Sequence, residues 1–256
     1  MPSRLPKTIL PDIAACVGFY TRLPVAWAGA SARPFAETQW AAPVAGALVG
    51  LCVGAVSWLA LALGLPASLA AAFALAAGIA LTGALHEDGL ADTIDGFGGG
   101  RDRDARLAIM RDSRIGSYGT LALGLSLIAR WAALAALAAA SPSAALVGAV
   151  AAHAASRAAL PAMMTGLPPA RPDGLAAGVG HMEPATAFVA AAVGLAFLLP
   201  GGLAFAVAAA ILVAGLALFV ARLALTRIGG QTGDVLGAAQ QAGEIAVVAA
   251  AAAFLT

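Results

Sequence analysis

Residues 67–96 read ASLAAAFALAAGIALTGALHEDGLADTIDG, an uncharged apolar run that passes directly into four carboxylates. The apolar part, residues 67–85, is long enough to cross a bilayer as a helix. Asp88, Asp92 and Asp95 follow at positions i, i+4 and i+7, which on a helix lie along one face about one turn apart. Grouped carboxylates repel one another unless a cation lies among them, and Mg²⁺ prefers oxygen ligands. This stretch therefore predicts a membrane helix followed by a cation site.

The composition of the whole chain is that of a polytopic membrane protein. Of its 256 residues, 61% are hydrophobic and 11% are charged, and the mean hydropathy is +0.92, whereas a soluble domain carries about 25% charged residues. The formal net charge of +1 gives no electrostatic reason to expect nucleic acid as a partner. Cys16 and Cys52 lie in apolar surroundings without metal-ligand spacing, so we interpret them as small buried hydrophobic residues.

Apolar stretches along the chain predict an all-α bundle of about six or seven transmembrane helices in a single integral-membrane domain, residues 1–256. The N-terminal segment, residues 1–40, contains an apolar stretch at 9–20 that is too short to cross a hydrocarbon core of ~30 Å. We therefore expect this segment at the membrane interface, followed by a transmembrane bundle over 41–256. The first half of the last stretch is polar, so a seventh crossing is the least certain. The expected spans are 41–63, 67–85, 118–140, 144–167, 185–199, 203–225 and 234–255.

The placement of charge orients this bundle. The turns at 64–66, 141–143 and 200–202 carry no charge. Basic residues gather instead in the N-terminal segment and in the expected loops, which are 86–117, 168–184 and 226–233. Since cytoplasmic loops carry an excess of arginine and lysine, the side with these loops is predicted to face the cytoplasm.

The acidic stretch has two interpretations, a solvated helix end or a metal site. Acidic residues at the C-terminal end of an apolar helix are unfavourable for the helix dipole, which weighs against the first. Gly89 and Gly96 lie beside the carboxylates, where the backbone can approach a ligand closely. The candidate ligands for Mg²⁺ are therefore Glu87, Asp88, Asp92 and Asp95, with the number of ions left open.

A second polar segment, MRDSRIGSYG at 110–119, carries groups that bind phosphate. Arg111 and Arg114 are three residues apart and are predicted to share a helix face. Gly116 and Gly119 open the next span, whose first amides form an anion site. Because the arginine fork binds phosphate oxygens bidentately, this segment resembles a phosphate clamp. The preceding segment, 98–106, is equally well interpreted as a flexible charged loop.

Two arginines lie inside expected spans, where polar groups are costly and tend to be functional. Arg157, with His153 one turn before it, lies in the middle of the fourth span, and Arg130 lies in the middle of the third. Arg157 is the stronger candidate for binding substrate. Arg130 is equally well explained by an ion pair with an acidic neighbour.

The last polar segment, GGQTGDVLGA at 229–238, precedes the C-terminal apolar stretch. Its glycines can present backbone amides to a ligand, and Thr232 or Asp234 can cap the last helix. Asp234, Gln241 and Glu244 recur at i, i+7 and i+10, which is again one helix face. A cap explains Asp234, but it does not explain a glutamine and a glutamate on the same face.

Together these segments resemble the cobalamin synthase family, also called adenosylcobinamide-GDP ribazoletransferases. The motifs HEDGLADTIDG at 86–96, MRDSRIG at 110–116 and GGQTGDVLGA at 229–238 occur in the family's order. FYTRLP at 19–24 is similar to its N-terminal Thr-Arg-x-Pro pattern. The acidic and C-terminal motifs are specific, whereas the Thr-Arg-x-Pro pattern alone is weak.

The resemblance implies a bacterial inner-membrane, magnesium-dependent enzyme with its active site at the cytoplasmic face. Such an enzyme joins adenosylcobinamide-GDP to α-ribazole or its 5′-phosphate, releases GMP and forms adenosylcobalamin or its 5′-phosphate, the late nucleotide-loop assembly step of cobalamin biosynthesis. Its partners would be these substrates and the lipid bilayer, with a homo-oligomer or association with other cobalamin-assembly enzymes left open.

The resemblance also suggests roles for residues in the motifs. The expected catalytic residues are Asp88, Asp92, Asp95 and Arg114, and the same aspartates with Glu87 would bind the metal. The expected substrate-binding residues are Arg22, Arg111, Asp112, Ser113, Gly116, Arg157, Gly230, Thr232, Asp234 and Glu244.

Two other functions compete with this interpretation. Residues 92–96, DTIDG, partly resemble the Asp-x-x-Asp-Gly core of CDP-alcohol phosphotransferases, which make phospholipids, but the rest of that family's motif is absent. A membrane transporter could use Arg130, Arg157 and the carboxylates as an ion path. The turns on the opposite side are short and uncharged, so they offer no charged exit for such a path.

Overall fold

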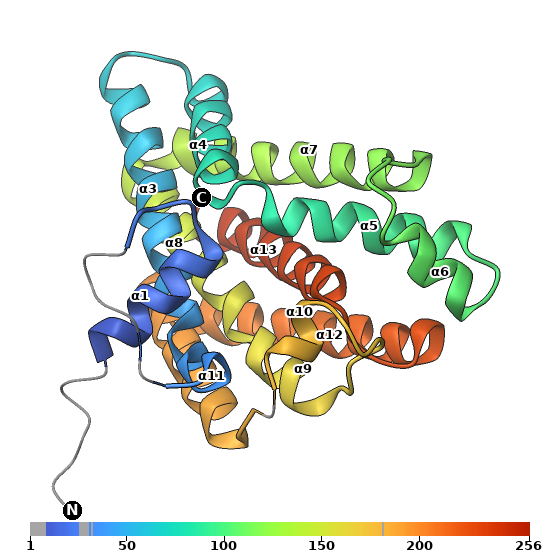
Figure 1. Cartoon of the computed structure of the whole chain (residues 1–256). Coiled ribbons are helices and arrows are strands. Elements are labelled where there is room, and N and C mark those ends of the chain that lie inside the picture. The colour runs from blue at the N-terminus through green and yellow to red at the C-terminus, as the bar shows by residue number, and fades with distance from the viewer. Residues whose placement is uncertain (1–8, 26–30, 32, 181) are drawn as a thin grey trace, which may run out of the picture.

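The computed structural model describes residues 9–25, 31, 33–180 and 182–256, which form a helical bundle without β-strands (Figure 1). Six of its helices are long and apolar enough to cross a membrane, or seven if one bent pair counts as a span. The predicted all-α, multi-pass membrane fold is therefore confirmed. The long helices are α3 (Ala42–Ala62), α7 (Ser117–Ala140), α8 (Pro142–Ala158) continued by α9 (Leu160–Gly166), α11 (Pro184–Leu198), α12 (Leu203–Ile228) and α13 (Gly233–Leu255). A 3₁₀ turn, η4 (Leu199–Gly201), extends α11, and α2 (Phe35–Thr38) with η3 (Gln39–Ala41) leads into α3.

The bent pair consists of α4 (Ala67–Thr82) and α5 (Leu85–Gly99), which meet at 86°. Gly83 and Ala84, with φ of 65° and 59°, are both left-handed and form the elbow. For alanine this conformation costs about 1–2 kcal/mol. The predicted span 67–85 is therefore wrong at its end, and the predicted polar loop 86–117 contains two helices, α5 and α6 (Arg103–Ile109).

Small residues let α3 and α8 pack backbone to backbone. Gly46, Gly50 and Gly54 repeat every fourth residue on α3, and a Cβ at any of them would overlap α8. This is the small-residue packing by which membrane helices approach closely. It fixes α8 in the bundle, and with it two buried polar residues, His153 and Arg157.

Helix α5 lies between α7 and α13 (Figure 1). A Cβ added to Gly89 would lie 2.8 Å from the carbonyl oxygen of Asp234, and one added to Gly237 would lie 3.2 Å from Cα of Gly89. The two helices therefore cross at a pair of glycines. This crossing brings the acidic helix against the start of the C-terminal helix.

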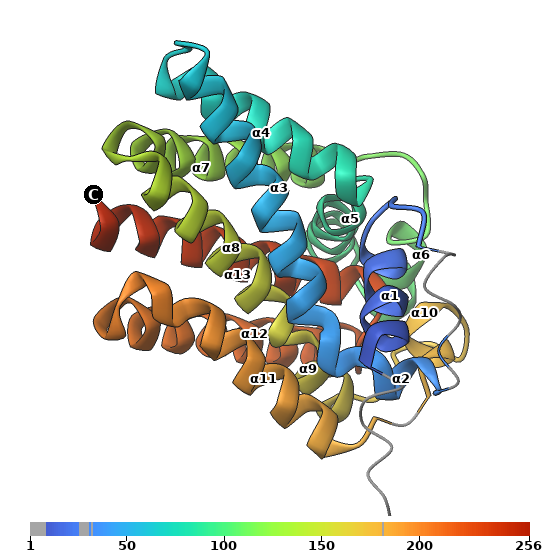
Figure 2. The same cartoon turned by 90° about the vertical axis from the view of Figure 1, so that its left-hand side faces the viewer.

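Figure 2 shows α1 (Ile9–Tyr20), α6 and α10 (Leu175–Gly178) gathered at one end of the bundle. The turns that join α3 to α4, α7 to α8 and α11 to α12 lie at the other end. Helix α1 packs on α3, and its bounds are those expected for the short apolar stretch. Residues 1–8, 26–30 and 32 of the expected interfacial segment lie outside the described residues.

The segment 98–106 is not a flexible charged loop. Asp102 caps α6, because its side chain accepts a hydrogen bond from the backbone amide three residues later. Arg103 Nε donates to the carbonyl of Ile228 at 3.0 Å. Arg106 Nη1 donates to the carbonyl of the residue just before Ile228, also at 3.0 Å. Cations at a helix C-terminus satisfy its free carbonyls and its dipole, so these arginines hold α6 against the end of α12.

Candidate active site

A cavity of about 290 Å³ lies where α1, α5, α9 and α13 meet. Four segments that are far apart in the sequence supply its polar and aromatic wall. Phe19 and Tyr20 come from α1, Asp88 from α5, Asp234 from α13 and Arg171 from the loop after α9. The glycine crossing of α5 and α13 explains why Asp88 and Asp234 share one cavity.

Asp88 lines this cavity, and Asp92 lies one turn further along α5 without lining it. Asp88 is exposed and Asp92 is half-buried, and neither has a hydrogen-bond or ion-pair partner among the described residues. Asp88, Asp95 and Asp234 all act electrostatically on Asp92. Like charges so arranged attract a cation. The predicted face of Asp88, Asp92 and Asp95 is therefore helical, but only the first two are free to bind one.

Arg171 is a cavity residue that the sequence analysis did not select. Its side chain is 17% exposed, and Nη2 lies 3.7 Å from Oδ2 of Asp234. Nη1 is buried and has no hydrogen-bond partner among the described residues. A free guanidinium donor on the wall of a cavity suits an anionic ligand. Arg171 is the only arginine of the 168–184 loop, a signal that could have found it.

The loop that begins the GGQTGDVLGA motif holds Arg171 in place. The amide of Gln231 donates to the carbonyl of Pro168 at 2.8 Å, and the amide of Ala170 donates to the carbonyl of Gln231 at 2.8 Å. Gly230 is needed here, because a Cβ would overlap the Pro168 carbonyl. The visible role of Gly230 is thus to join two loops.

The same motif starts helix α13. Thr232 Oγ1 accepts the amide of Val235 at 3.2 Å, which confirms one of the two predicted caps. The hydroxyl of Thr232 also donates to Oδ2 of Asp234 at 3.1 Å. Thr232 therefore orients the Asp234 carboxylate in the cavity.

Asp95, although on the same face as Asp92, has a different environment. Its Oδ2 accepts the amide of Gly116 at 2.7 Å, and its Oδ1 accepts that of Gly119 at 2.8 Å. The anion site predicted at the start of the third span exists, and the carboxylate of Asp95 fills it. Gly116 and Gly119 have no room for a side chain, since a Cβ would overlap this carboxylate.

Glu87 belongs to a polar network in the interior of the bundle. Arg130 Nη1 lies 2.9 Å from both Glu87 Oε1 and Glu244 Oε1. Glu244 Oε2 lies 3.1 Å from Nδ1 of His153 and accepts a hydrogen bond from the side-chain Nε2 of Gln240 at 2.7 Å. The ion-pair interpretation of Arg130 is correct, and Glu244 is one of its partners. Glu87 and Glu244 could bind a metal or substrate only by giving up these partners.

Arg157 stands between this network and the cavity. It is 1% exposed, donates to the carbonyl of His153 at 3.0 Å, and lies 3.4 Å from Nδ1 of His86. Its guanidinium carbon lies 5.9 Å from the ring centroid of Tyr20. Arg157 does not line the cavity, whereas His86 and Tyr20 do. Any effect of Arg157 on substrate therefore passes through these two side chains.

The expected phosphate clamp lies outside the cavity. Helix α6 ends at Ile109, so the prediction that Arg111 and Arg114 share a helix face is wrong. The side chain of Asp112 accepts the amide of Arg114 at 3.1 Å, a local bond that competes with helix. Asp112 also pairs with the Arg114 side chain at 2.6 Å, which lowers the Asp112 pKa to about 2.

Three other residues that were expected to bind substrate also lie outside the cavity. Arg111 pairs with Asp173 at 2.5 Å on the surface. Ser113 is exposed. Arg22 is exposed, and its guanidinium lies over Gly83 at the elbow between α4 and α5, but it does not line the cavity.

The free carboxylates of α5 fit a magnesium ion that takes its remaining ligands from water and substrate. No group of three or more histidine, cysteine, aspartate or glutamate residues in the described part of the chain is arranged to hold a metal by itself. Asp88 and Asp92 offer two free carboxylates one turn apart. Mg²⁺ commonly takes one or two carboxylates and completes its shell with water and substrate phosphates.

Comparison with known proteins identifies the family of this chain. The family model of cobalamin-5-phosphate synthase matches residues 12–252. A protein of Mesorhizobium japonicum named adenosylcobinamide-GDP ribazoletransferase is 51% identical over 251 residues, covering 98% of this chain and 96% of its own. Proteins of the same name from Bradyrhizobium diazoefficiens and Azorhizobium caulinodans are 49% and 50% identical, over 97% and 93% of this chain and 95% and 94% of their own.

No solved structure matches the chain significantly. The family match covers nearly the whole described bundle, including all three motifs that meet at the cavity. The chain belongs to the cobalamin-5-phosphate synthase family.

Proposed function

We propose that this multi-pass membrane protein is an adenosylcobinamide-GDP ribazoletransferase that works at the cavity between α1, α5, α9 and α13. One observation carries the proposal. The FYTRLP, HEDGLADTIDG and GGQTGDVLGA segments, which lie far apart in the sequence, all contribute to the wall of this one cavity. Two aspartates, Asp88 and Asp234, and an arginine with an unpartnered donor, Arg171, belong to its polar part.

The reaction is a displacement at phosphorus. A ribose hydroxyl other than the 5′ one, which is free both in α-ribazole and in its 5′-phosphate, forms a bond through its oxygen to the phosphorus that carries cobinamide. The bond from that phosphorus to the GMP oxygen breaks, so GMP leaves and adenosylcobalamin, or its 5′-phosphate, forms. The hydroxyl proton passes to a carboxylate of the cavity.

Asp88 and Asp92 would hold Mg²⁺ in this scheme, because they are the free carboxylates of α5. When bound, the ion neutralises charge on the diphosphate and on the departing GMP. Arg171 binds phosphate oxygens through its unpaired Nη1, and Asp234 and Thr232 hold Arg171 in position. We assign Glu87 and Asp95 to holding α5 rather than to the metal.

We further propose that the end of the bundle with α1, α6 and α10 faces the cytoplasm and that the protein lies in the cell inner membrane. The distribution of arginines supports this orientation. It places the cavity on the side where nucleotide-activated substrates are available.

The test is an assay of the purified protein in detergent with adenosylcobinamide-GDP and α-ribazole. We expect GMP and cobalamin in equal amounts, loss of both on chelation, and recovery with Mg²⁺. Release of CMP from a CDP-activated lipid instead would support a phosphotransferase of lipid synthesis. Solute flux in proteoliposomes without product would support a transporter, and either result would refute the proposal.

A further inference from the structure

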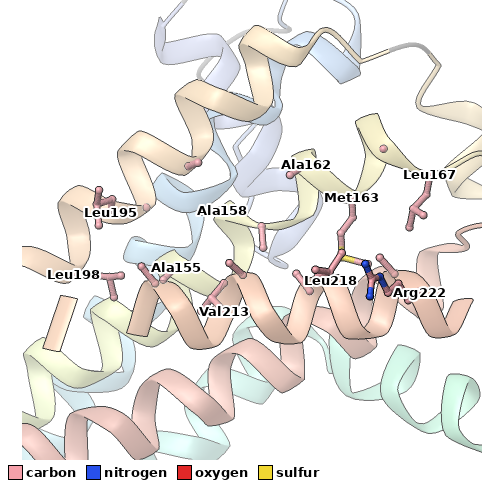
Figure 3. A pocket seen from close by; sticks show the side chains of 18 of the residues that line it. Ala155, Ala158, Ala162, Met163, Leu167, Leu195, Leu198, Val213, Leu218 and Arg222 are labelled. Carbon is pink, nitrogen blue, oxygen red and sulfur yellow. The ribbon is translucent and has the colours of Figure 1, made fainter. Parts of the chain in front are cut away.

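A second cavity, separate from the candidate active site, lies between α8, α9, α11 and α12 (Figure 3). Its volume is about 570 Å³, and it shares no lining residue with the first cavity. All its lining residues are alanine, glycine, leucine, valine or methionine, with the exception of Arg222. In the 18-residue apolar windows of the spans Pro184–Gly201 and Leu203–Ile228, only 22% is buried, so much of α11 and α12 is on the outside of the bundle.

Arg222 is an unusual residue for this position. It is exposed and has no hydrogen-bond or ion-pair partner in the part of the chain that the structure describes. Arg130 and Arg157, which lie inside other spans, are buried, and each has a partner, Glu87 for Arg130 and the carbonyl of His153 for Arg157. Arg222 lies six residues before the end of α12 at Ile228, which is about 9 Å along the helix. A charge at this depth is costly unless its head reaches the interface or an anion.

The dimensions of the groove match one leaflet of a bilayer. Along α12 its lining extends from Leu225 to Ala210, fifteen residues or about 22 Å, and the part from Arg222 to Ala210 is about 18 Å long. Half of a ~30 Å hydrocarbon core is about 15 Å. Figure 3 shows Arg222 at one end of the groove and Leu198 towards the other. The groove is thus an apolar channel one leaflet deep, with a single cation at the headgroup level.

We propose that this groove binds a phospholipid with an anionic headgroup. One acyl chain lies between α11 and α12, and the lipid phosphate pairs with Arg222. The charge complementarity selects the headgroup, because no residue of the described chain neutralises this guanidinium. The apolar lining selects an acyl chain rather than a soluble anion.

Native mass spectrometry of the detergent-purified protein with phosphatidylglycerol or phosphatidylcholine tests the headgroup. We expect one retained phosphatidylglycerol and about fivefold weaker binding of it by Arg222→Gln, the usual effect of one basic residue on anionic lipid. Arg227→Gln is the matched control, since Arg227 is on the same helix but does not line the groove. Equal losses in both variants, or no loss in Arg222→Gln, would overturn the proposal.

A second pair of variants tests the position of the acyl chain. Ala214 is exposed within the groove, so Ala214→Phe should fill it and prevent retention of the lipid. Ala204→Phe is the control, an exposed alanine of α12 outside the groove, and should retain the lipid. Circular dichroism checks that both variants remain helical. Retention by Ala214→Phe, or a protein dimer that this variant converts to a monomer, would show that no lipid occupies the groove.

Discussion

Glu87 and Asp88 are adjacent on α5, yet they meet opposite environments. Glu87 is buried, 2.9 Å from Arg130, in a network of buried side chains from α7, α8 and α13. Asp88 is exposed in the cavity and has no partner among the described residues. Neighbours on a helix point about 100° apart, so one face of α5 serves the interior and another serves the site. An acidic motif can therefore combine structural charges with reactive ones.

The arginines divide in the same way. Both arginines have guanidinium nitrogens without a hydrogen-bond partner among the described residues, but Arg130 is buried between two glutamates, whereas Arg171 lies on the wall of the cavity. Partners and burial, rather than residue type, distinguish a charge that stabilises the bundle from one that is available to substrate. The following predictions test this division, from the largest expected effect to the smallest.

The strongest effect on stability should come from Arg130→Met. It would leave Glu87 and Glu244 buried without their cation, and breaking a buried pair costs about 3–5 kcal/mol. Thermal unfolding in detergent measures the loss. Arg114→Met, which removes an exposed arginine, should leave the unfolding temperature nearly unchanged. Equal stability of the two variants would contradict a structural role for the interior network.

Asp92→Asn should lower the catalytic rate rather than the stability. Removal of a free carboxylate beside the metal should lower the rate of GMP release at least about 100-fold, while the unfolding temperature stays that of the unmodified protein. Asp104→Asn, an exposed aspartate paired on the surface with Arg103, is the control and should keep full activity. Full activity of Asp92→Asn would remove this residue from the mechanism.

Arg171→Gln should have an intermediate effect. The loss of one charge-assisted hydrogen bond to phosphate, about 1.4 kcal/mol, corresponds to a roughly tenfold higher KM for adenosylcobinamide-GDP. Arg114→Gln should change KM much less, because Arg114 lies outside the cavity. Steady-state kinetics would reverse the assignment if Arg114 proved the more sensitive of the two.

The smallest effect should come from Asp95→Asn. The amide retains one acceptor for the start of α7, so we expect a loss of about 1 kcal/mol, as for a helix cap. Hydrogen exchange at the amide of Gly119 should become faster, with kcat little changed. A large loss of kcat with unchanged exchange would mean that Asp95 takes part in catalysis.

Much of this arrangement follows from local sequence. The helical face of Asp88 and Asp92, the cap at Thr232 and the short helix at the N-terminus all depend on neighbouring residues, so spacing and propensity predict them. The ion-pair alternative for Arg130 followed from the cost of burying a charge. The partner could not be named, because Glu87 and Glu244 are 43 and 114 residues away in the chain.

The errors have physical causes as well. The elbow depends on a left-handed Ala84, a conformation that alanine rarely adopts and that no local signal favours. Arg111 and Arg114 have helical spacing, but the side chain of Asp112 accepts the amide of Arg114, a local hydrogen bond that replaces the helical one. Arg171 reaches the cavity only because two distant loops pair through Gln231, which composition does not reveal.

The most direct test of the division on α5 compares Asp88→Asn with Glu87→Gln in the same two measurements, the Mg²⁺ dependence of GMP release and the unfolding temperature. We predict that Asp88→Asn loses activity, or needs much more Mg²⁺, at an unchanged unfolding temperature. Glu87→Gln should unfold at a lower temperature and keep the Mg²⁺ requirement of the unmodified protein. A raised Mg²⁺ requirement in Glu87→Gln with undiminished stability would contradict the account, since it would make Glu87 a metal ligand.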